Sequence, residues 1–565
     1  MILDSIRHRI DVLLEPWAAK QSVAVPAYSL DDPPPGIEAD LASNLPLILS
    51  KSLKKSPKIV AAELQNILSS DKNLFESVAI AGAGFLNFKV SLQAWQGEIR
   101  AILQQKETYG RSAEGAGKKV LIEFVSANPT GPLHVGHGRG AALGDSLALI
   151  LAHRGYAVTR EYYINDAGNQ VQLLGESVQA RCRELEGKPT QLPEEGYHGD
   201  YVRDVAKTYL AQHPQGVDDP GTIISFALRH LQQEIDRDLQ DFGVRFDSWF
   251  SEASVVQKGL VDKYVALLKE KGFVEEYEDA VWFVNPAEHE EQRDHPSSAS
   301  KEDGLAATKK GQPDKDRVLK RRDGRWTYFA TDIAYHADKF ERGFDRLIDI
   351  WGADHHGYVP RVKGSVQALG FDPGRLHILL YQLVSLSRNG VPVSMSKRSG
   401  DFITLREVLD EVGKDACRFF FALRGPNTTM DFDLELAKKH SNDNPVYYLQ
   451  YAHARICSIF RQPDAAGSVL EADLGRLQEK EERDLMRRLS SFESVLRVCI
   501  REDSPHPLAT YLLDLCRQFH HFYDHHRVLG EERTLTLARL ALIAAVREVL
   551  RSGLALLGVS APESM

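Results

Sequence analysis

The sequence predicts an α/β protein of several domains, with a parallel sheet at its centre, an N-terminal α+β domain and a C-terminal all-α bundle. Its length of 565 residues favours three or four domains, at about 150 residues per domain. A composition of 43% hydrophobic and 26% charged residues is typical of globular proteins with packed cores. Short apolar runs alternate with helical periodicity in the middle of the chain, whereas only helical periodicity follows residue 441.

Residues 1–112 form the predicted N-terminal α+β domain. The chain begins with an amphipathic helical pattern, and its acidic residues interrupt the apolar run that a signal peptide requires. Strand patterns follow at Val78–Ile80 and Phe85–Phe88. No helix pattern follows Gly82 and Gly84 directly, so these glycines indicate a turn between two strands rather than a dinucleotide-binding loop.

Residues 113–440 form the predicted central domain. Val120–Phe124 has the pattern of a short buried strand, and an amphipathic helix follows it. Further strand patterns at Leu347–Trp351 and Ile378–Leu383 indicate repeated βα units, which predict a parallel sheet. The segment 285–314 has too few apolar residues to pack, and we expect a mobile insertion there.

Residues 441–565 form the predicted helical bundle. Apolar side chains recur there at steps of three and four, and the last helix, Leu535–Leu557, is followed by Gly558, a typical helix stop. The recurring apolar residues are Leu485, Leu489, Phe492 and Leu496, and Leu512, Leu515, Phe519 and Phe522.

The net charge and the distribution of the cysteines limit the cellular environment and the binding partners that the sequence predicts. The net charge of -10 gives no overall attraction for nucleic acid, so any polyanion must bind local basic clusters. Two such clusters either contact RNA or form solvated faces. They consist of Lys51, Lys54, Lys55 and Lys58, and of Lys315, Arg317, Lys320, Arg321, Arg322 and Arg325. Single, scattered cysteines and the lack of a long apolar stretch predict a cytoplasmic protein with no membrane association.

The segment from Glu123 to Arg139 joins the first buried strand to the amphipathic helix. Such a corner directs backbone N–H groups and the positive end of the helix outward, an arrangement that suits a phosphate. Gly136 allows close approach of a ligand to the backbone, and His134 and His137 offer hydrogen-bond donors. The alternative for the two histidines is half of a zinc site, although no cysteine pair accompanies them.

His134-Val-Gly-His137 resembles the HIGH signature of class I aminoacyl-tRNA synthetases. Val393-Ser-Met-Ser-Lys-Arg398 is similar to their KMSKS loop, with Ser394 in place of the first lysine and Lys397 in place of the second. A loop that carries a cation suits adenylate formation, because negative charge develops on the departing pyrophosphate.

Further motifs along nearly the whole chain resemble the arginyl-tRNA synthetase family. They are Glu123-Phe-Val-Ser-Ala-Asn128, Tyr163-Ile-Asn-Asp-Ala-Gly168, Thr327-Tyr-Phe-Ala-Thr-Asp332, Asn444-Pro-Val446, Tyr451-Ala-His-Ala-Arg455 and Gly82-Ala-Gly-Phe-Leu-Asn-Phe88. The resemblance implies a Rossmann-like catalytic domain at 113–440, an N-terminal domain that recognises the tRNA elbow at 1–112, and an anticodon-binding bundle at 441–565.

The resemblance also implies the reaction and its partners. ATP, L-arginine and tRNA(Arg) would yield arginyl-tRNA(Arg), AMP and diphosphate through an arginyl-adenylate, with Mg²⁺ on the ATP phosphates, no tightly bound protein metal and a monomeric chain. The implied catalytic residues are His134, His137 and Lys397. The implied ATP-binding residues are His134, Gly136, His137, Gly352, Asp354, Met395, Ser396 and Lys397.

Recognition of arginine requires carboxylates, because a guanidinium pairs best with planar acceptors. Tyr328 and Asp332 lie one turn apart if their segment is helical, and the resemblance makes them guanidinium readers together with Glu252. An ordinary helix surface is the alternative for all three residues. The resemblance assigns the α-amino and α-carboxyl ends of arginine to Ser126 and Asn128, and it adds Glu123 and His134 as further arginine-binding residues.

Several assignments keep a structural alternative. Asp354 follows a predicted strand and either contacts the adenosine or caps a helix. The run His520–His526 suggests either a metal site or a bundle surface that faces RNA. Tyr523 is either a stacking platform for an anticodon base or a core residue. The resemblance adds Asn87, Tyr451 and Arg455 as tRNA contacts.

Two other functions remain open at this point. A tRNA-binding protein without catalysis would need only the N-terminal domain and the bundle. A synthetase for another amino acid would have different residues in place of Tyr328 and Asp332.

Overall fold

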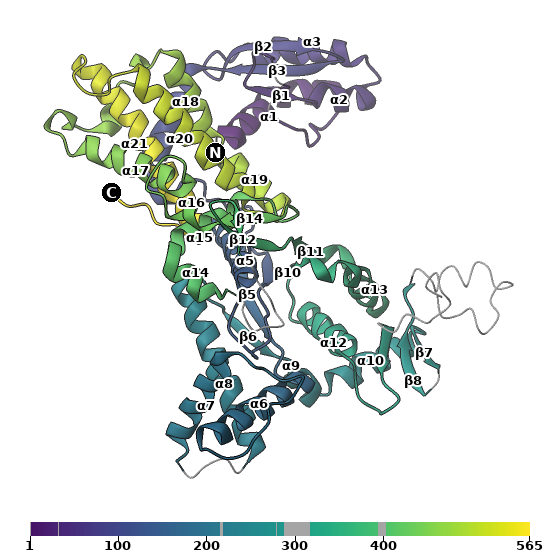
Figure 1. Ribbon diagram of the computed structural model, residues 1–565. Helices are drawn as coiled ribbons and strands as arrows, with labels where there is room; N and C mark the ends of the chain where they lie inside the picture. Colours follow the sequence, from purple (N-terminus) through teal and green to yellow (C-terminus); the bar gives the residue numbers. More distant parts are fainter. Residues whose placement is uncertain are drawn as a thin grey trace.

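A computed structural model describes residues 2–31, 33–34, 36–214, 219–277, 279–286, 317–393 and 403–565. Figure 1 shows a central column from which two parts project to the same side, the N-terminal unit at one end and the region around α10, α12 and α13 nearer the other. The predicted insertion at 285–314 lies, beyond Pro286, outside the described residues. Among the residues described, no helix combines the length and the apolar composition that crossing a membrane requires.

The N-terminal unit is a small three-stranded antiparallel sheet covered by helices. Its strands follow the order β1-β3-β2, and the turn at Gly82 and Gly84 connects β2 to β3, as the sequence predicts. The elements are α1 (Ile2–Gln21), β1 (Leu41–Ser43), α2 (Leu45–Leu53), α3 (Pro57–Leu68), β2 (Phe75–Ala81), β3 (Phe85–Val90) and α4 (Leu92–Gln105).

A five-stranded parallel sheet in the order β11-β10-β4-β5-β6 lies at the centre, so the predicted parallel α/β core is confirmed. Its strands are β4 (Lys119–Glu123), β5 (Ala157–Ile164), β6 (Ser248–Ser251), β10 (Arg346–Gly352) and β11 (Leu376–Tyr381). Alternate side chains of β4 serve two cores: Val120 and Ile122 pack with α5 (Val135–His153), whereas Leu121 packs with α12 (Tyr328–Glu341) and α13 (Val359–Leu369). Strand β11 ends at Tyr381, two residues before the predicted end.

Two insertions extend the central sheet. Helices α6 (Asn169–Leu185), α7 (Asp200–Gln212) and α8 (Pro220–Asp241) lie between β5 and β6 and form a separate apolar core at the lower end of Figure 1. Between β6 and α12 lie α9 (Glu252–Gln257), α10 (Leu260–Glu270) and an antiparallel sheet of β7 (Val274–Tyr277), β8 (Ala280–Phe283) and β9 (Val318–Lys320). The short helix η3 (Ala353–Tyr358) connects β10 to α13.

A third small sheet and the helical bundle complete the chain. The sheet and its helices are β12 (Val384–Arg388), β13 (Val391–Pro392), α14 (Leu405–Val412), α15 (Lys414–Leu423), β14 (Met430–Asp433) and α16 (Leu434–Lys438). The bundle, which confirms the predicted all-α region, consists of α17 (Pro445–Phe460), α18 (Lys480–Ser490), α19 (Phe492–Arg501), α20 (His506–His525) and α21 (Arg533–Leu556). The predicted apolar residues are buried, but Leu489 and Phe492 belong to two helices that are separated at Ser491.

Buried charged side chains link α5 to the bundle, one of them through Arg418 of α15. The Arg418 guanidinium, which is 0% exposed, donates to Asp145 of α5 at 2.7 Å and to the Leu557 carbonyl just after α21 at 2.7 Å. At the other end of α5, Arg154 is also 0% exposed and donates to Glu493 of α19 at 2.9 Å. Truncating one partner of such a pair leaves a buried charge without compensation, so α5 and the bundle are energetically linked.

Candidate active site

The corner between β4 and α5 is strained. Val125 and Ser126 both adopt positive φ angles, 68° and 40°, which non-glycine residues rarely do. Two hydrogen bonds hold the Ser126 hydroxyl in place: it donates to Glu123 Oε1 at 2.8 Å and accepts from the Tyr163 backbone N–H at 3.1 Å. Backbone strain of this kind is found mainly at functional sites, where the surrounding structure holds the residues in the unfavourable conformation.

The two signature histidines cap the N-terminus of α5. His134 Nδ1 accepts from the Gly136 backbone N–H at 3.1 Å, and His137 Nδ1 accepts from the His134 backbone N–H at 3.2 Å. Their rings stack with centroids 3.6 Å apart. Because each Nδ1 accepts, the imidazole proton lies on Nε2, where it is a donor suited to a phosphoryl oxygen.

The flank of the second signature loop lies beside these histidines. His134 forms an isolated β-bridge with Thr404, and the Leu405 backbone N–H donates to the Leu133 carbonyl at 2.7 Å. A Cβ on Gly138 would lie 2.6 Å from Leu405, so glycine permits this contact. The predicted ATP contacts Met395, Ser396 and Lys397 themselves lie outside the described residues.

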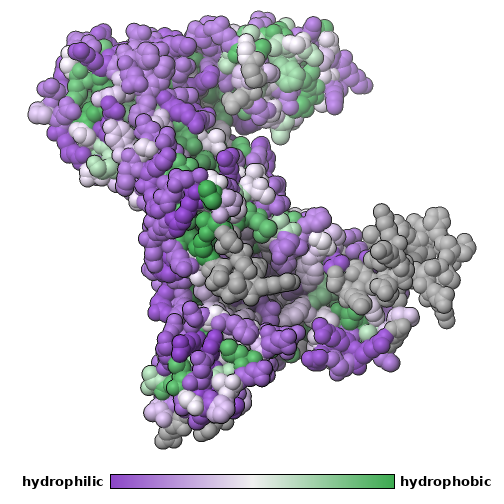
Figure 2. Space-filling model, viewed as in Figure 1, coloured by the Kyte–Doolittle hydropathy of each residue, from purple (hydrophilic) through white to green (hydrophobic). Residues whose placement is uncertain are grey.

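A cavity of about 1160 Å³ opens over the carboxyl ends of the strands. The neighbours β4 and β10 meet where the strand order reverses, which is the usual ligand position in open α/β sheets. Its lining includes Tyr163, Glu252, Tyr328, Asp332, Asp354 and Tyr358, together with the charged or titratable side chains of Arg321, Arg322, Asp323, His355 and Arg361. In Figure 2, apolar residues gather in the recess at the middle of the visible face, where the lobes meet.

Glu252 is the first residue of α9 and is only 4% exposed. Asp166 fixes this helix start, because its carboxylate accepts from Ser251 Oγ at 2.6 Å and from the Ala253 backbone N–H at 2.9 Å. Glu252 Oε1 accepts from Thr331 at 3.2 Å, whereas the buried Oε2 has no hydrogen-bond partner among the described residues. Burial, together with the negative charge of Asp332, raises the pKa of Glu252 to about 7.

Asp332 lies in the same cavity, on α12. The predicted helix is present, and it places Tyr328 one turn before Asp332, with the Tyr328 side chain 48% exposed. Asp332 Oδ2 accepts from the Tyr358 hydroxyl at 2.6 Å. Burial raises the pKa of Asp332, although the Tyr358 hydrogen bond opposes this change. The geometry therefore joins two carboxylates from distant segments in one pocket that suits a single planar cation.

A buried ionic network lies behind the pocket. The Lys339 ammonium of α12 donates to Glu123 at the end of β4 and, at 2.7 Å, to Asp349 of β10. His336 lies 2.9 Å from the other Asp349 oxygen. Both Glu123 oxygens are thus engaged, with Ser126 and with Lys339, and Glu123 does not line the cavity. Its predicted contact with arginine stays a prediction.

The remaining predicted ligand contacts lie around the same strand ends. Gly352 ends β10, and Asp354 follows it in η3, where its exposed carboxylate lines the cavity. The cap residue of η3 is Gly352, without a side-chain hydrogen bond, so the helix-capping alternative for Asp354 has no support. Asn128 lies on the loop after β4 and hydrogen-bonds Gln170 at 2.5 Å.

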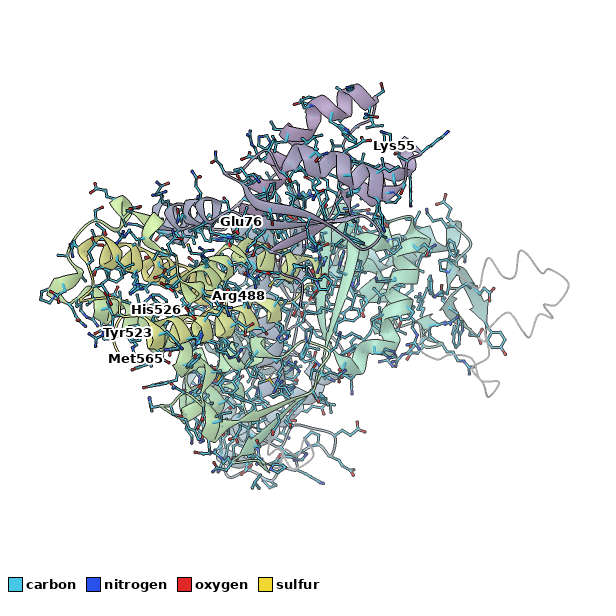
Figure 3. The ribbon with its side chains drawn as sticks, turned by 90° about the horizontal axis from the view of Figure 1, so that it is seen from above. Lys55, Glu76, Arg488, Tyr523, His526 and Met565 are labelled. Atoms are coloured by element: carbon cyan, nitrogen blue, oxygen red, sulfur yellow. The ribbon has the colours of Figure 1, made fainter. Side chains whose placement is uncertain are left out.

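The predicted tRNA contacts in the bundle form one continuous row. The Arg455 guanidinium of α17 lies 4.3 Å from the Tyr523 ring centroid and 5.9 Å from that of Tyr451. Tyr451 stacks with Tyr447, which lines a cavity that also includes Met565. Figure 3 shows Tyr523 and Met565 on the bundle, far from Lys55 on the N-terminal unit, where Asn87 lies partly exposed on β3.

The metal alternatives gain no support from the side chains. His526 hydrogen-bonds Glu481 at 3.0 Å, and His520 packs against Tyr448. Within the described ranges, no three or more histidine, cysteine, aspartate or glutamate side chains group as a metal site would require.

Sequence reasoning missed three residues of the site, namely Tyr163, Asp166 and Tyr358. Tyr163 and Asp166 belong to a motif that the sequence analysis recognised, but nothing in its spacing indicates that it reaches Glu252. Tyr358 lies four residues after Asp354, and only the fold brings it to Asp332. The Tyr163 hydroxyl is buried without a described partner, close to both carboxylates.

Comparisons with known proteins agree with this geometry. Residues 2–90 match the model of the arginyl tRNA synthetase N terminal domain, residues 98–422 match that of the class I (R) tRNA synthetase catalytic domain, and residues 449–565 match that of the DALR anticodon binding domain.

Relatives match over nearly the whole length of the chain. The arginine–tRNA ligase of Desulfosudis oleivorans is 47% identical, with 96% of this chain and 95% of the relative covered. That of Carboxydothermus hydrogenoformans is 47% identical, with 95% and 94% covered. The structure of Thermus thermophilus arginyl-tRNA synthetase shares the fold, with a TM-score of 0.72, 24% identity and complete coverage of both chains. The chain therefore belongs to the arginyl-tRNA synthetase family of class I aminoacyl-tRNA synthetases.

Proposed function

We infer that the chain attaches L-arginine to tRNA(Arg) in a reaction that consumes ATP. The pocket that contains Glu252 and Asp332 carries this inference, because a buried carboxylate oxygen without a partner calls for a cationic ligand. A guanidinium that bridges the two carboxylates would supply the missing hydrogen bonds. The residues that cap α5 lie at the strand ends of the same sheet, where the ATP phosphates would bind.

The proposed chemistry has two steps. The arginine carboxylate attacks the α-phosphate of ATP, which forms arginyl-adenylate and releases diphosphate, and a ribose hydroxyl of the terminal tRNA adenosine then displaces AMP. His134 and His137 would donate from Nε2 to phosphoryl oxygens, and Lys397 would stabilise the departing diphosphate. No side chain needs to form a covalent intermediate, because positioning and charge stabilisation lower the barrier. Mg²⁺ would bind the ATP phosphates rather than a protein cage.

The other assignments are proposals of the same kind. The unit up to residue 112 would bind the tRNA elbow through Asn87, and the bundle from residue 441 would bind the anticodon through Tyr451, Arg455 and Tyr523. We propose a monomer that acts in the cytoplasm, where its five buried free cysteines would stay reduced.

The direct test is exchange of pyrophosphate into ATP with arginine, lysine or cysteine, each with and without total tRNA. Exchange with arginine alone among the three supports the proposed substrate. Exchange with lysine instead would assign the pocket to another amino acid. No exchange, together with tight tRNA binding, would favour the binding protein without catalysis.

Lys397→Ala tests the role of the second signature loop. We expect a fall of about 10²- to 10³-fold in adenylate formation, because a charge that stabilises the transition state is lost. Binding of tRNA, measured by filter retention, should change little. Equal adenylate formation in the variant and the parent chain would remove Lys397 from the mechanism.

A further inference from the structure

One hydroxyl holds the Asp332 carboxylate from across the pocket. Tyr358 Oη donates to Asp332 Oδ2 at 2.6 Å. The Tyr358 ring is itself fixed, because it packs edge-on against Phe329, with centroids 5.8 Å apart, and at a tilt against Trp351, with centroids 6.1 Å apart. Tyr358 comes from η3 and Asp332 from α12, so this bond joins two elements that only the fold brings together.

The bond distinguishes Asp332 from its neighbours in the pocket. Glu252 Oε2 and the Tyr163 hydroxyl are both buried without a partner among the described residues, whereas Asp332 Oδ2 is already held. A carboxylate that is bound at one oxygen cannot rotate freely, so the direction of its second oxygen is fixed before the ligand arrives.

We propose that Tyr358 is a positioning residue for arginine recognition, whose hydroxyl fixes Asp332 in the orientation and the charged form that the guanidinium requires. This proposal rests on the proposed function. Tyr358 does not need to touch arginine, because it acts through Asp332. A guanidinium has a rigid planar set of donors, and its affinity therefore depends on the plane of the carboxylate as well as on its charge.

The charged form of Asp332 depends on several neighbours. A hydrogen bond to a carboxylate favours ionisation, and the Tyr358 bond acts on Asp332 in this direction, against burial. Removal of the hydroxyl therefore raises the pKa of Asp332. The other titratable or charged groups that face Asp332 are His336 and Lys339 of α12, His355 of η3, Glu252 of α9, and Tyr163 of β5.

The test is Tyr358→Phe in the full chain, which removes one oxygen atom and keeps the ring. Steady-state aminoacylation gives kcat and the KM for arginine and for ATP between about pH 6 and pH 8.5. We expect the KM for arginine to rise about tenfold, because the lost bond is to a charged group, and to rise more at the low end of this pH range than at the high end, because the lost bond favours the ionised form of Asp332. The KM for ATP should stay within about twofold.

Tyr335→Phe is the matched control. Tyr335 lies on the same helix as Asp332, and its hydroxyl also donates to a buried carboxylate, Glu161 Oε1, at 2.7 Å, but it does not line the cavity. This variant should lose a similar amount of thermal stability and keep the parental KM for arginine at every pH.

The outcomes of these kinetic measurements decide whether Tyr358 has the proposed positioning role. A defect in arginine KM that shrinks as the pH rises, found in Tyr358→Phe and absent from Tyr335→Phe, supports the positioning role. An unchanged KM, or a rise that Tyr335→Phe shares, overturns it. An equal rise at every pH that is confined to Tyr358→Phe would assign the bond to orientation alone and overturn its role in the charge of Asp332. A parent chain that fails to use arginine would refute the proposed function instead, so the two failures are distinguishable.

Discussion

At the scale of single residues, the central feature is two buried carboxylates for one cation. Glu252 and Asp332 both line the cavity, and the charge of each raises the cost of charging the other. Glu252, with its pKa raised to about 7, is therefore partly protonated at neutral pH in the free chain. An arriving guanidinium favours the ionised form, so binding of arginine and release of a proton are linked.

This linkage predicts a pH-dependent affinity for arginine. The pKa of Glu252 is raised to about 7, so the site lacks one charge below that pH and gains it above. The affinity should fall by up to tenfold per pH unit as the pH drops below about 7, and should level off above about 8. Calorimetric titration in two buffers of different ionisation enthalpy measures the released proton directly.

The control for this prediction is Glu252→Gln, which keeps the shape and removes the titrating group. It should bind arginine more weakly at pH 8, and the proton release assigned to residue 252 should disappear. If the parent chain and the variant release the same number of protons, Glu252 is not the linked group.

At the scale of elements, the sequence predicted those helices, strands and corners that depend on a local pattern of residues. The corner from β4 to α5 and the helix that carries Tyr328 and Asp332 follow from apolar periodicity and from motifs. The approach of Glu252 to Asp332 in one cavity spans the insertion between β6 and α12, and no local pattern encodes such a distance. The break at Ser491 was also missed, because Leu489, Phe492 and Leu496 keep helical spacing across it.

The packing of α5 on β4 gives a prediction at this scale. A Cβ on Gly144 would lie 2.3 Å from the Phe124 ring, so Gly144→Ala must push α5 away from the sheet. We expect a loss of about 1–3 kcal/mol in the free energy of unfolding, as for other overpacked cores. A rise in the KM for ATP should accompany it, because the N-terminus of α5 shifts. Thermal unfolding and steady-state kinetics measure the two effects.

Gly97→Ala provides the comparison. Gly97 is also inside a helix, α4, but nothing lies within 4 Å of the added methyl group. Helix propensity alone should then stabilise the variant by up to about 1 kcal/mol. A stable Gly144→Ala variant with parental kinetics would contradict the close packing of α5.

At the scale of the whole molecule, the acidic chain must bind an anionic partner through local surfaces. The N-terminal unit and the region around α10–α13 project to the same side of the column, and this arrangement leaves a broad concave side between them (Figure 1). Lys51, Lys54 and Lys58 lie exposed on or beside α2 and α3, and Lys55 pairs with Glu63 at 2.8 Å. We therefore expect the exposed lysines to contribute to tRNA binding through phosphate contacts.

Salt dependence tests this expectation. Affinity for tRNA should fall steeply with salt, and changing Lys51, Lys54 and Lys58 together to Gln should reduce the slope of log K against log[salt] by up to about one per phosphate contact. Lys207→Gln, on α7, is the control and should keep the parental slope. An unchanged slope in the triple variant would identify the cluster as a solvated face.

The ion pairs of α5 have a consequence for how this molecule can be divided. A fragment that ended before residue 441 would keep the Asp145–Arg418 pair, but it would leave Arg418 without the Leu557 carbonyl and Arg154 without Glu493. The predicted domain boundary near residue 441 therefore does not separate two independently stable units of the folded chain. We therefore expect the catalytic part by itself to be less stable than the full chain unless Arg154 and Arg418 are also substituted. Exchange of bundles between relatives should succeed only where the incoming bundle has a carboxylate at the position of Glu493 and the recipient keeps Arg154 and Arg418.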